Sequence, residues 1–341
     1  MDITQEIENL EGLGEALKAL HAQQKNCGFV LTDSDEQNDS ESIHHSSPSD
    51  GGVVFEFLWL PVREHRGDVA YLQKRGILTQ CDQSQLININ NGKACFLCKD
   101  NITVQMPKEV LYPISSGGYE YLAGAQFAYL GPNHFTIMNS THVQQVWRKP
   151  VIEFMLEFTM NAPEFRITWN GYGAGASILY HEHMQATTCE FPIERIKLSS
   201  ANQVFGSNSQ SSVFAPDYPT PVWVVQGQDR HDVAEAVHRL VSSWHSRNPD
   251  QHSENVLAYC GDRQMLTACV FPRTSTKRTH PLIRKGGVAI FEVAGRIVFS
   301  NPEERANFDL GLDLLRSRAE DLLGAVAPDD TDMEFEAALS G

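Results

Sequence analysis

The sequence predicts an α+β fold, in which antiparallel strands and flanking helices occur in both halves of the chain. Two kinds of periodicity support this prediction. Phe55, Phe57 and Trp59 alternate with other residues, as they do along a strand with one buried face. Apolar residues recur every three or four positions over residues 3–23, as they do along one face of a helix.

Further elements follow along the chain in the same two patterns. Pro150 lies near the start of an apolar helical stretch, where it should either begin a helix or break one. Asn301 and Pro302, with the two acids after them, are typical of a helix start. Strands are predicted at 127–130, 135–138, 165–170, 181–191, 256–260, 265–271 and 288–293, and helices at 143–160, 231–247 and from 301 onward.

Composition divides the chain into four parts. Residues 1–52 hold the first helix and an acidic, Ser-rich loop at 33–52 that we expect to be mobile. The two halves are 53–200 and 201–328, and a segment rich in Ser, Asn and Pro connects them. Residues 329–341 form an acidic tail that we expect to be frayed.

Charge and length exclude several classes of function. The 341 residues include 27 Lys and Arg against 43 Asp and Glu, which gives a net charge of −16. A chain this acidic has no general attraction for nucleic acids or anionic membranes, so a bound phosphate must meet a local cluster of donors. No apolar run is long enough to span a membrane, and no signal peptide is recognisable. With seven cysteines, an odd number, the chain is expected to be cytoplasmic with reduced thiols.

The chemically informative segment runs from Asn170 to Glu190. It contains His181, His183 and Gln185 at intervals of two, so on a strand all three side chains would share one face. Glycines before them allow backbone N–H groups to approach an anion. Two imidazoles and an amide aimed at a phosphate suit nucleotidyl transfer, in which a neutral histidine attacks phosphorus and nearby donors stabilise the developing charge.

The residues alone leave two other interpretations of this segment open. The two histidines could be buried core residues, or they could be two ligands of a metal ion. A third interpretation fails, although Gly171, Gly173 and Ala176 fit a relaxed dinucleotide-binding fingerprint. That fingerprint requires a helix directly after the glycines, whereas a period-two pattern typical of a strand follows them in this chain.

A second motif is the single C-x-x-C formed by Cys95 and Cys98. It could be redox-active, metal-binding or incidental, because no second C-x-x-C completes a four-cysteine site. If it binds metal, two histidines must complete the set, and the candidates are His134, His142 and His181. Such a Cys₂His₂ set leaves no open coordination position, so the ion would be a structural Zn²⁺.

Taken together, these motifs resemble the branch of the histidine-triad (HIT) superfamily that contains galactose-1-phosphate uridylyltransferase and the diadenosine tetraphosphate phosphorylases. In that branch the triad reads H-x-H-x-Q and follows an asparagine, glycines and a serine. The resemblance implies two HIT-like halves, with His183 as the nucleophile and Gln185 as a donor to the phosphoryl oxygens. The matching residues are Asn170, Gly175, Ser177, His181, His183 and Gln185.

The resemblance also implies a zinc site and a second substrate-binding region. Uridylyltransferases take zinc ligands from a C-x-x-C pair, a P-x-H turn and the first triad histidine, and dimers are common in the family. Asn255 and Arg273 lie in segments that resemble the second half of the phosphorylases. Arg273, Lys277 and Arg278 would then form the local cationic cluster for a phosphate, although a solvated basic loop is an alternative explanation. The implied zinc ligands are Cys95, Cys98, His134 and His181.

Two departures separate this chain from the standard pattern. Glu182 stands between the two histidines, where uridylyltransferases have proline. Ser177 and His181 are four positions apart, where the uridylyltransferase and phosphorylase patterns have three. The sequence therefore indicates a side-branch that keeps the active-site residues, and the sugar or acceptor specificity does not carry over.

The function predicted from the sequence is transfer of a nucleoside monophosphate between phosphate-bearing compounds through a covalent nucleotidyl-His183. Gln185 cannot donate a proton as a histidinium can, which favours phosphate-type leaving groups and acceptors. One alternative is a phosphorylase of nucleotide sugars or dinucleoside polyphosphates. Another is a zinc-stabilised protein that binds a nucleotide without turning it over.

Overall fold

The computed structural model describes residues 12–31, 42–45, 53–82, 84, 86–90, 93–200, 203–205, 211–283 and 287–329. The chain packs into two compact units, each built from segments that are far apart in the sequence. Unit 1 draws on Met1–Glu41, Leu60–Gln145 and Ile178–Cys189, and unit 2 on Ser42–Trp59, Val146–Ser177 and Glu190–Gly341. The division into four parts in chain order stays a prediction. The tail from residue 330 onward and most of the loop at 33–52 lie outside the described residues.

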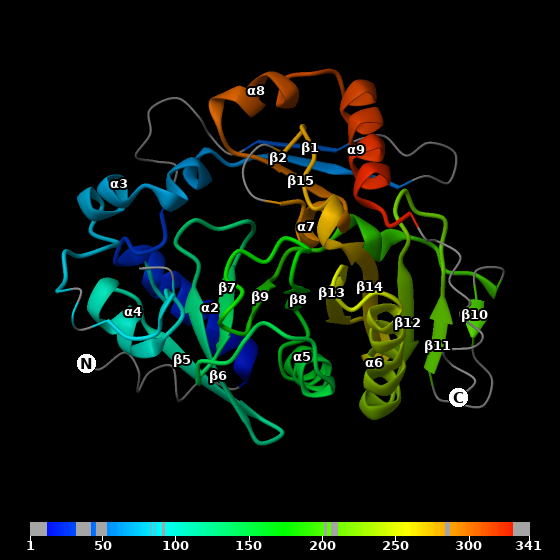
Figure 1. Cartoon of the computed structure of the whole chain (residues 1–341), viewed down its shortest axis with the longest axis horizontal. Helices are drawn as coiled ribbons and strands as arrows, with labels where there is room; N and C mark the ends of the chain where they lie inside the picture. The colour runs from blue at the N-terminus through cyan, green and yellow to red at the C-terminus, as the bar shows by residue number, and fades with distance from the viewer. Residues whose placement is uncertain are drawn as a thin grey trace. The chain divides into compact units, whose positions relative to one another are not determined.

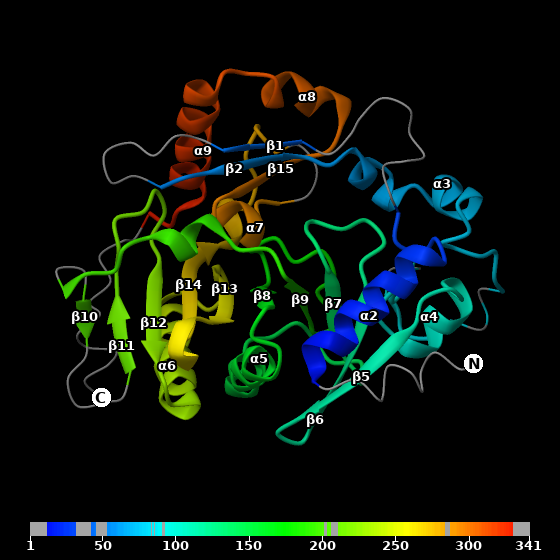
Figure 2. The same cartoon turned by 180° about the vertical axis from the view of Figure 1, so that it is seen from behind.

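Unit 1 contains an antiparallel sheet with a long helix across one face. The strand order is β5 (Leu111–Ser116), β6 (Tyr119–Ala125), β7 (Phe135–Asn139) and β9 (His183–Thr187). Helix α2 (Leu13–Asn26) crosses the strands, as Figure 2 shows, and its apolar side is buried. His21 of α2 meets Phe135 of β7 edge to face, with 5.8 Å between the ring centroids.

Short elements complete unit 1 and lead into the C-x-x-C motif. The pair β3 (Ile89–Asn90) and β4 (Lys93–Ala94) is antiparallel and directly precedes Cys95. Cys98 then occupies the N-cap position of α4 (Lys99–Gln105). A 3-10 helix at Pro61–Gly67 and the helix α3 (Val69–Lys74) also belong to this unit.

Unit 2 contains six antiparallel strands, which two helices cover on one face (Figure 1). Its strand order is β8 (Arg166–Asn170), β13 (His252–Cys260), β14 (Leu266–Thr274), β12 (Trp223–Gly227), β11 (Ser211–Phe214) and β10 (Gln203–Phe205). Helices α5 (Lys149–Asn161) and α6 (Arg230–Arg247) lie side by side in both views. Their apolar faces bury Phe158 and Trp244. The class is therefore α+β with antiparallel sheets and flanking helices, as predicted.

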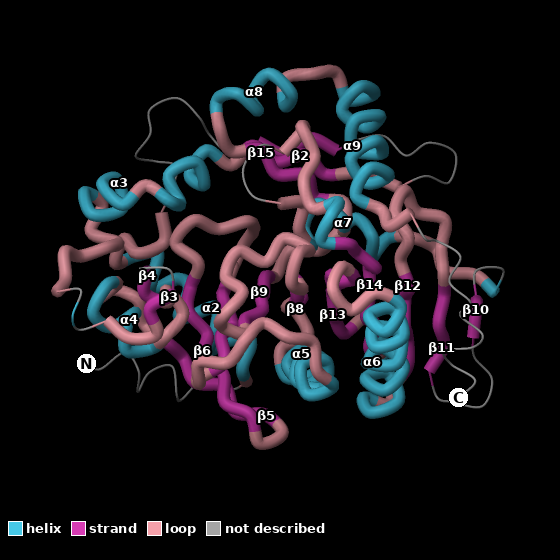
Figure 3. The backbone as a smooth tube through the Cα atoms, in the orientation of Figure 1, coloured by secondary structure: helices cyan, strands magenta, loops and turns pink. Residues whose placement is uncertain are grey.

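A smaller sheet in unit 2 joins the early and late parts of the chain (Figure 3). Its order is β1 (Ser42–His45), β2 (Glu56–Trp59) and β15 (Arg296–Phe299). β1 and β2 pair antiparallel, whereas β2 and β15 are parallel. Helices α7 (Ile290–Val293), α8 (Pro302–Phe308) and α9 (Leu312–Val326) complete the unit. Among the described residues, none of the helices has the length and apolar character needed to cross a membrane.

Several predicted elements are confirmed, and proline and capping chemistry explain where two of the helices begin. Pro150 lies in the first turn of α5, where its missing N–H costs nothing, so the helix begins at Lys149 and residues 143–148 are not helical. At the start of α8 the Asn301 side chain accepts a hydrogen bond from the Glu304 N–H, and the Glu304 side chain accepts one from the Asn301 N–H, which together form a capping box. The predicted helix at 3–23 is α2, with residues 1–11 outside the described part. The other confirmed elements are β2, β7, β8, β13, β14 and α6.

Other predictions were wrong in identity or extent. Residues 127–130 form bends after β6 rather than a strand. The apolar run at 288–293 is largely the helix α7, because Glu292 accepts a bond from the Ala289 N–H and starts a helical turn. The single C-terminal helix is two helices, separated at Asp309–Gly311. β1 lies inside the predicted loop at 33–52, β10 and β11 lie inside the connecting segment at 200–222, and the predicted strand at 181–191 is only β9.

A buried ion pair gives a direct test of the packing of unit 2. Glu56 of β2 has a nearly buried carboxylate, which accepts from Arg296 at 2.8 Å and from the partly exposed Arg195 at 3.2 Å. Glu56→Ala leaves the Arg296 guanidinium buried without its counter-charge, so we expect a loss of about 3 kcal/mol in the free energy of unfolding. Urea denaturation measures the loss.

The matched control for that variant is Glu320→Ala. Glu320 forms an exposed pair with Arg316 one helical turn away, and such pairs contribute only about 0.5 kcal/mol. Equal losses in the two variants would contradict the assignment of Glu56 as a buried partner.

Candidate active site and metal centre

His183 is the first residue of β9, and its main chain and ring are both held by hydrogen bonds. The side-chain amide of Gln145 accepts from the His183 N–H at 2.7 Å and donates to the His183 carbonyl at 2.9 Å. The ring lies 2.9 Å from the carbonyl oxygen of His181 through Nδ1. A carbonyl can only accept, so Nδ1 carries the hydrogen and Nε2 carries the lone pair. Burial lowers the pKa of His183 to about 4, so the imidazole is neutral near pH 7.

Gln185 lies on the same face of β9 as His183, as the period-two pattern predicted. Its side chain interacts with His134, whose pKa is held well below its ordinary value mainly by burial and then by the nearby Arg63 guanidinium. Arg66 acts on His134 in the same direction. Two guanidinium groups therefore act on His134 within unit 1.

These two arginines are functional candidates that sequence reasoning missed. They lie in the short 3-10 helix at Pro61–Gly67, where Arg63 donates to the carbonyl of Ala128 at 2.5 Å and Arg66 is exposed. No strand or helix periodicity marks such a segment. The available signal was the R-x-x-R spacing alone, which does not distinguish this pair from other close pairs such as Arg316 and Arg318.

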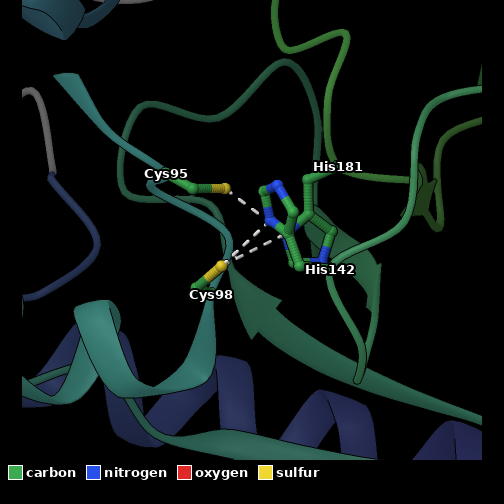
Figure 4. Close-up of side chains that lie close together, drawn as sticks. All are labelled: Cys95, Cys98, His142 and His181. Atoms are coloured by element: carbon green, nitrogen blue, oxygen red, sulfur yellow. Dashed lines mark hydrogen bonds between the residues drawn. The ribbon is translucent and has the colours of Figure 1, made fainter. Parts of the chain in front are cut away.

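The C-x-x-C motif forms a compact cluster with two histidines (Figure 4). Cys95 Sγ lies 3.3 Å from Nδ1 of His181, and Cys98 Sγ lies 3.2 Å from Nδ1 of His142 and 3.7 Å from Nδ1 of His181. All four potential ligand atoms lie within 4.8 Å of one another. Three of the side chains are buried, and His142 is exposed.

The donor set fits a tetrahedral zinc ion. With zinc–sulfur bonds of about 2.3 Å and zinc–nitrogen bonds of about 2.0–2.1 Å, sulfur and nitrogen ligands should lie about 3.6 Å apart. The cluster already has spacings of 3.2–3.7 Å between sulfur and nitrogen. His181 Nε2 lies 2.8 Å from the carbonyl of Asn139, which places the hydrogen on Nε2 and turns the Nδ1 lone pair toward the cysteines.

Burial makes the thiolate form of Cys95 dependent on a bound cation. Burial raises the pKa of Cys95 to about 12, so without a cation this thiol stays protonated near pH 7. A metal ion reverses that preference, because coordination stabilises the thiolate. The Leu97 N–H already points at Cys95 Sγ at 3.4 Å, which suits a thiolate acceptor.

The fourth member of the cluster is His142, and His134 is not part of it. His134 is fully buried near Gln185, and its Nδ1 accepts from the Leu130 N–H at 3.0 Å. The assignment of His134 as a metal ligand is therefore corrected. His134, in the P-x-H turn, lies just before the start of β7, whereas His142 lies just after its end. Because β7 and β9 are antiparallel, the end of β7 lies beside the start of β9, where His181 is found.

Three predicted residues form a buried polar framework in unit 2. Asn170 Oδ1 accepts from Asn255 Nδ2 at 2.8 Å and from the Ile290 N–H at 2.9 Å. Arg273 is fully buried, and it donates to Asn255 Oδ1 at 2.5 Å and to the Val288 carbonyl at 3.1 Å. Burial lowers the pKa of Arg273 to about 10, which leaves it charged near pH 7.

The other predicted binding residues of unit 2 have different surroundings. Gly175 has φ +95°, and a Cβ there would lie 2.6 Å from Ala289, so only glycine fits this close approach. Ser177 and Arg278 are exposed. Lys277 donates to the Ala327 carbonyl at 3.1 Å and pairs with Asp329. Arg273, Lys277 and Arg278 therefore do not share one environment, and their binding of a phosphate stays a prediction.

The antiparallel α+β fold, the H-x-H-x-Q motif and the Cys₂His₂ cluster agree with the resemblance to the HIT-like branch of uridylyltransferases and diadenosine tetraphosphate phosphorylases. Comparisons with known proteins support this resemblance. A family model described as a domain of unknown function (DUF4922) matches residues 60–188. Galactose-1-phosphate uridylyltransferase of Bacillus subtilis is 23% identical over 328 residues, which cover 85% of this chain and 60% of that protein.

A second curated relative and a solved structure agree with this result. Galactose-1-phosphate uridylyltransferase of Halalkalibacterium halodurans is 24% identical over 192 residues, 53% of this chain and 37% of that protein. The chain thus spans less than two thirds of the length of either curated relative. Yeast Ap4A phosphorylase Apa2 shares the fold with a TM-score of 0.56 and 12% identity, covering 93% of this chain and 95% of that one. It has also been solved with Ap4A and with AMP.

Variants of His142 and His134 test which of these two histidines is the fourth metal ligand. His142→Ala removes one of four ligands, so we expect the purified protein to retain less than half of the wild-type zinc per chain. His134→Ala removes a buried imidazole outside the cluster and should keep the wild-type ratio. Zinc per chain is measured by elemental analysis after dialysis against a weak chelator.

Cys98→Ser is the positive control for metal loss, and it should lower both zinc content and soluble yield. If His134→Ala loses zinc while His142→Ala keeps it, His142 is not the fourth ligand and the cluster does not hold the metal.

Proposed function

We propose that the protein is a nucleotidyltransferase that acts through a covalent nucleotidyl-His183 and moves a nucleoside monophosphate between phosphate-bearing compounds. The observation that carries the proposal is the state of His183. Its ring is neutral, its Nδ1–H is held by the His181 carbonyl, and its Nε2 carries the lone pair. A neutral, oriented imidazole of this kind is suited to attack on phosphorus.

The proposed reaction has two displacement steps. In the first, Nε2 of His183 forms a bond to the α-phosphorus, the bond from that phosphorus to the bridging oxygen breaks, and the leaving phosphate takes the electron pair. In the second, a phosphate oxygen of the acceptor attacks the same phosphorus and the phosphorus–nitrogen bond breaks. No general acid is required at either step, because a phosphate leaves as an anion, and this agrees with glutamine at position 185.

Gln185 and the two arginines are proposed to hold the phosphates. The amide of Gln185 would donate to the phosphoryl oxygens, where charge develops during the displacement. Arg63 and Arg66 would balance the charge of the leaving phosphate, which an acidic chain cannot do by its general field. Both guanidinium groups lower the pKa of His134, which interacts with Gln185, and this supports the role.

Zinc is proposed to be structural. Cys95, Cys98, His142 and His181 would hold it, and the ion would supply a fixed anchor for the chain without an open coordination position. His181 would bind the ion through its side chain, and its carbonyl accepts a hydrogen bond from the His183 ring. The bound ion would therefore help to fix the position of the proposed nucleophile.

Further substrate-binding residues are proposed in unit 2. The polar framework of Asn170, Asn255 and Arg273 positions the glycine-rich segment that contains Gly175 and leads to Ser177. The full set proposed for substrate binding is Asn170, Gly175, Ser177, Asn255, Arg273, Lys277 and Arg278. Because Arg273 is fully buried, its contribution is to hold Asn255, and the backbone N–H groups and Ser177 would contact the nucleotide.

A second candidate function is phosphorolysis of a dinucleoside polyphosphate or nucleotide sugar, with inorganic phosphate as the acceptor. The fold match to yeast Ap4A phosphorylase, which covers almost the whole chain, favours this candidate. Both candidates share the covalent first step and differ in the acceptor. Product formation with inorganic phosphate alone, without a sugar phosphate, would identify the phosphorylase.

The covalent step can be tested by intact-protein mass spectrometry. The wild-type protein is incubated with nucleotide sugars and with dinucleoside polyphosphates, without an acceptor. We expect a mass increase of one nucleoside monophosphate from at least one donor, and its size identifies the base. His183→Ala should give no adduct while it keeps its zinc content.

His231→Ala, an exposed histidine on α6, is the matched control and should form the wild-type amount of adduct. Adduct on His183→Ala would reject His183 as the nucleophile. A zinc-loaded wild type that binds nucleotide without any adduct would support the non-catalytic binding protein instead.

The phosphate role of the arginines predicts a selective kinetic effect. Arg66→Ala removes one of the two charges that act on His134, so we expect kcat/KM for the nucleotide donor to fall by at least about tenfold, as for a charge-assisted hydrogen bond of about 1.5–3 kcal/mol. Steady-state kinetics at fixed ionic strength measures this loss. Arg247→Ala, an exposed arginine of unit 2, should stay within twofold of wild type. Equal losses in both variants would indicate a general charge effect.

A further inference from the structure

Glu182 is a buried acid between the two triad histidines. Its side chain is 0% exposed within unit 1. A carboxylate taken out of water is costly unless hydrogen bonds hold it. Its presence at the position where the uridylyltransferase pattern has proline therefore calls for a structural reason.

Two donors hold one oxygen of this carboxylate. Glu182 Oε1 accepts from the Tyr121 hydroxyl at 3.0 Å and from Asn139 Nδ2 at 2.9 Å. Tyr121 and Asn139 are partners across β6 and β7, so the carboxylate lies over a rigid pair of strands. Both donor residues are buried, which protects these bonds from competition with water.

The main chain of Glu182 makes two further hydrogen bonds. Its carbonyl accepts from the Asn139 N–H at 3.0 Å, and its N–H donates to the Val143 carbonyl at 2.7 Å. Val143 directly follows the metal-centre residue His142. Proline has no N–H and could not make the second bond.

Asn139 connects this arrangement to both histidines of the metal centre. Its carbonyl accepts from His181 Nε2 at 2.8 Å and so sets the tautomer of that ring. Its side-chain oxygen accepts from the N–H of Thr141 at 3.0 Å and from the Thr141 hydroxyl at 2.9 Å. Thr141 directly precedes His142, so the orientation of the Asn139 amide shapes the turn that presents His142.

We propose that Glu182 is a positioning residue for the metal centre and for the nucleophile. By fixing the amide of Asn139, its carboxylate holds His181 and His142 in place, and with them the start of β9 that presents His183. The consequence for catalysis rests on the proposed function, whereas the consequence for metal retention does not. Removal of a group that orients a metal ligand through hydrogen bonds typically changes the metal affinity by about 10–100-fold.

The test compares three variants of the full chain in the zinc-loaded form. Glu182→Ala removes the carboxylate, and we expect zinc release to a chelator to be at least about tenfold faster. Its kcat should fall about tenfold while KM for the donor stays within twofold, because the substrate contacts themselves are unchanged. Glu182→Gln should behave like wild type in both measurements, because its side-chain oxygen accepts the same two bonds.

Tyr121→Phe keeps the test valid if Glu182→Ala fails to fold. It removes one donor to Glu182 and should accelerate zinc release by a smaller factor, about threefold, in keeping with the loss of one hydrogen bond. Tyr218→Phe is the matched control, because it also removes a buried hydroxyl that donates a hydrogen bond, in this case to the Val293 carbonyl in unit 2. It should leave zinc release unchanged.

Three outcomes would overturn the proposal. The first is zinc release within twofold of wild type in both folded Glu182→Ala and Tyr121→Phe. The second is zinc release from Glu182→Gln that is as fast as from Glu182→Ala. The third is a wild-type protein that retains no zinc. Failure of the proposed function looks different. In that case the wild type forms no nucleotide adduct, but the order of zinc release among the variants still holds.

Discussion

The hydrogen bond from Nδ1 of His183 to the carbonyl of His181 is the interaction on which the candidate site depends. It fixes the tautomer that leaves a lone pair on Nε2, and burial keeps that imidazole neutral. The side chain of His181 lies in the cysteine cluster while its carbonyl serves His183. One residue therefore links the cysteine cluster to the His183 ring through its own side chain and main chain, so a disturbance at the cysteines reaches that ring directly.

Buried polar groups in both units act as framework rather than as direct ligands. In unit 2, Arg273 looks from its sequence context like a phosphate-binding arginine, yet its guanidinium is occupied by Asn255 and a backbone carbonyl. In unit 1, Gln145 uses both ends of its amide on the main chain of His183. Side chains of this kind hold the main chain and their polar neighbours in place through hydrogen bonds that are protected from water. The exposed Arg66 is the better candidate for contact with a charged ligand.

Sequence reasoning succeeded where a local period determines the result. The interval of two places His183 and Gln185 on one face, and the proline and asparagine signals locate the starts of α5 and α8. It failed where the result depends on the path of the chain in space. His134 and His142 are eight residues apart on opposite sides of β7, and only the pairing of β7 with β9 determines which one reaches the cysteines. The arginines at 63 and 66 lie in a 3-10 turn, which has no periodic signature.

The discontinuous construction of unit 1 bears on the order in which the protein can be assembled. Its sheet ends with β9, which lies beyond the long stretch Val146–Ser177 that belongs to unit 2. The cysteines at 95 and 98 therefore leave the ribosome more than eighty residues before His181. During that interval two thiols are available without their full set of partners, and β7 lacks its neighbour. Completion of the Cys₂His₂ cluster and pairing of β7 with β9 are then late, coupled events in biosynthesis, because both require residues that emerge after Ser177.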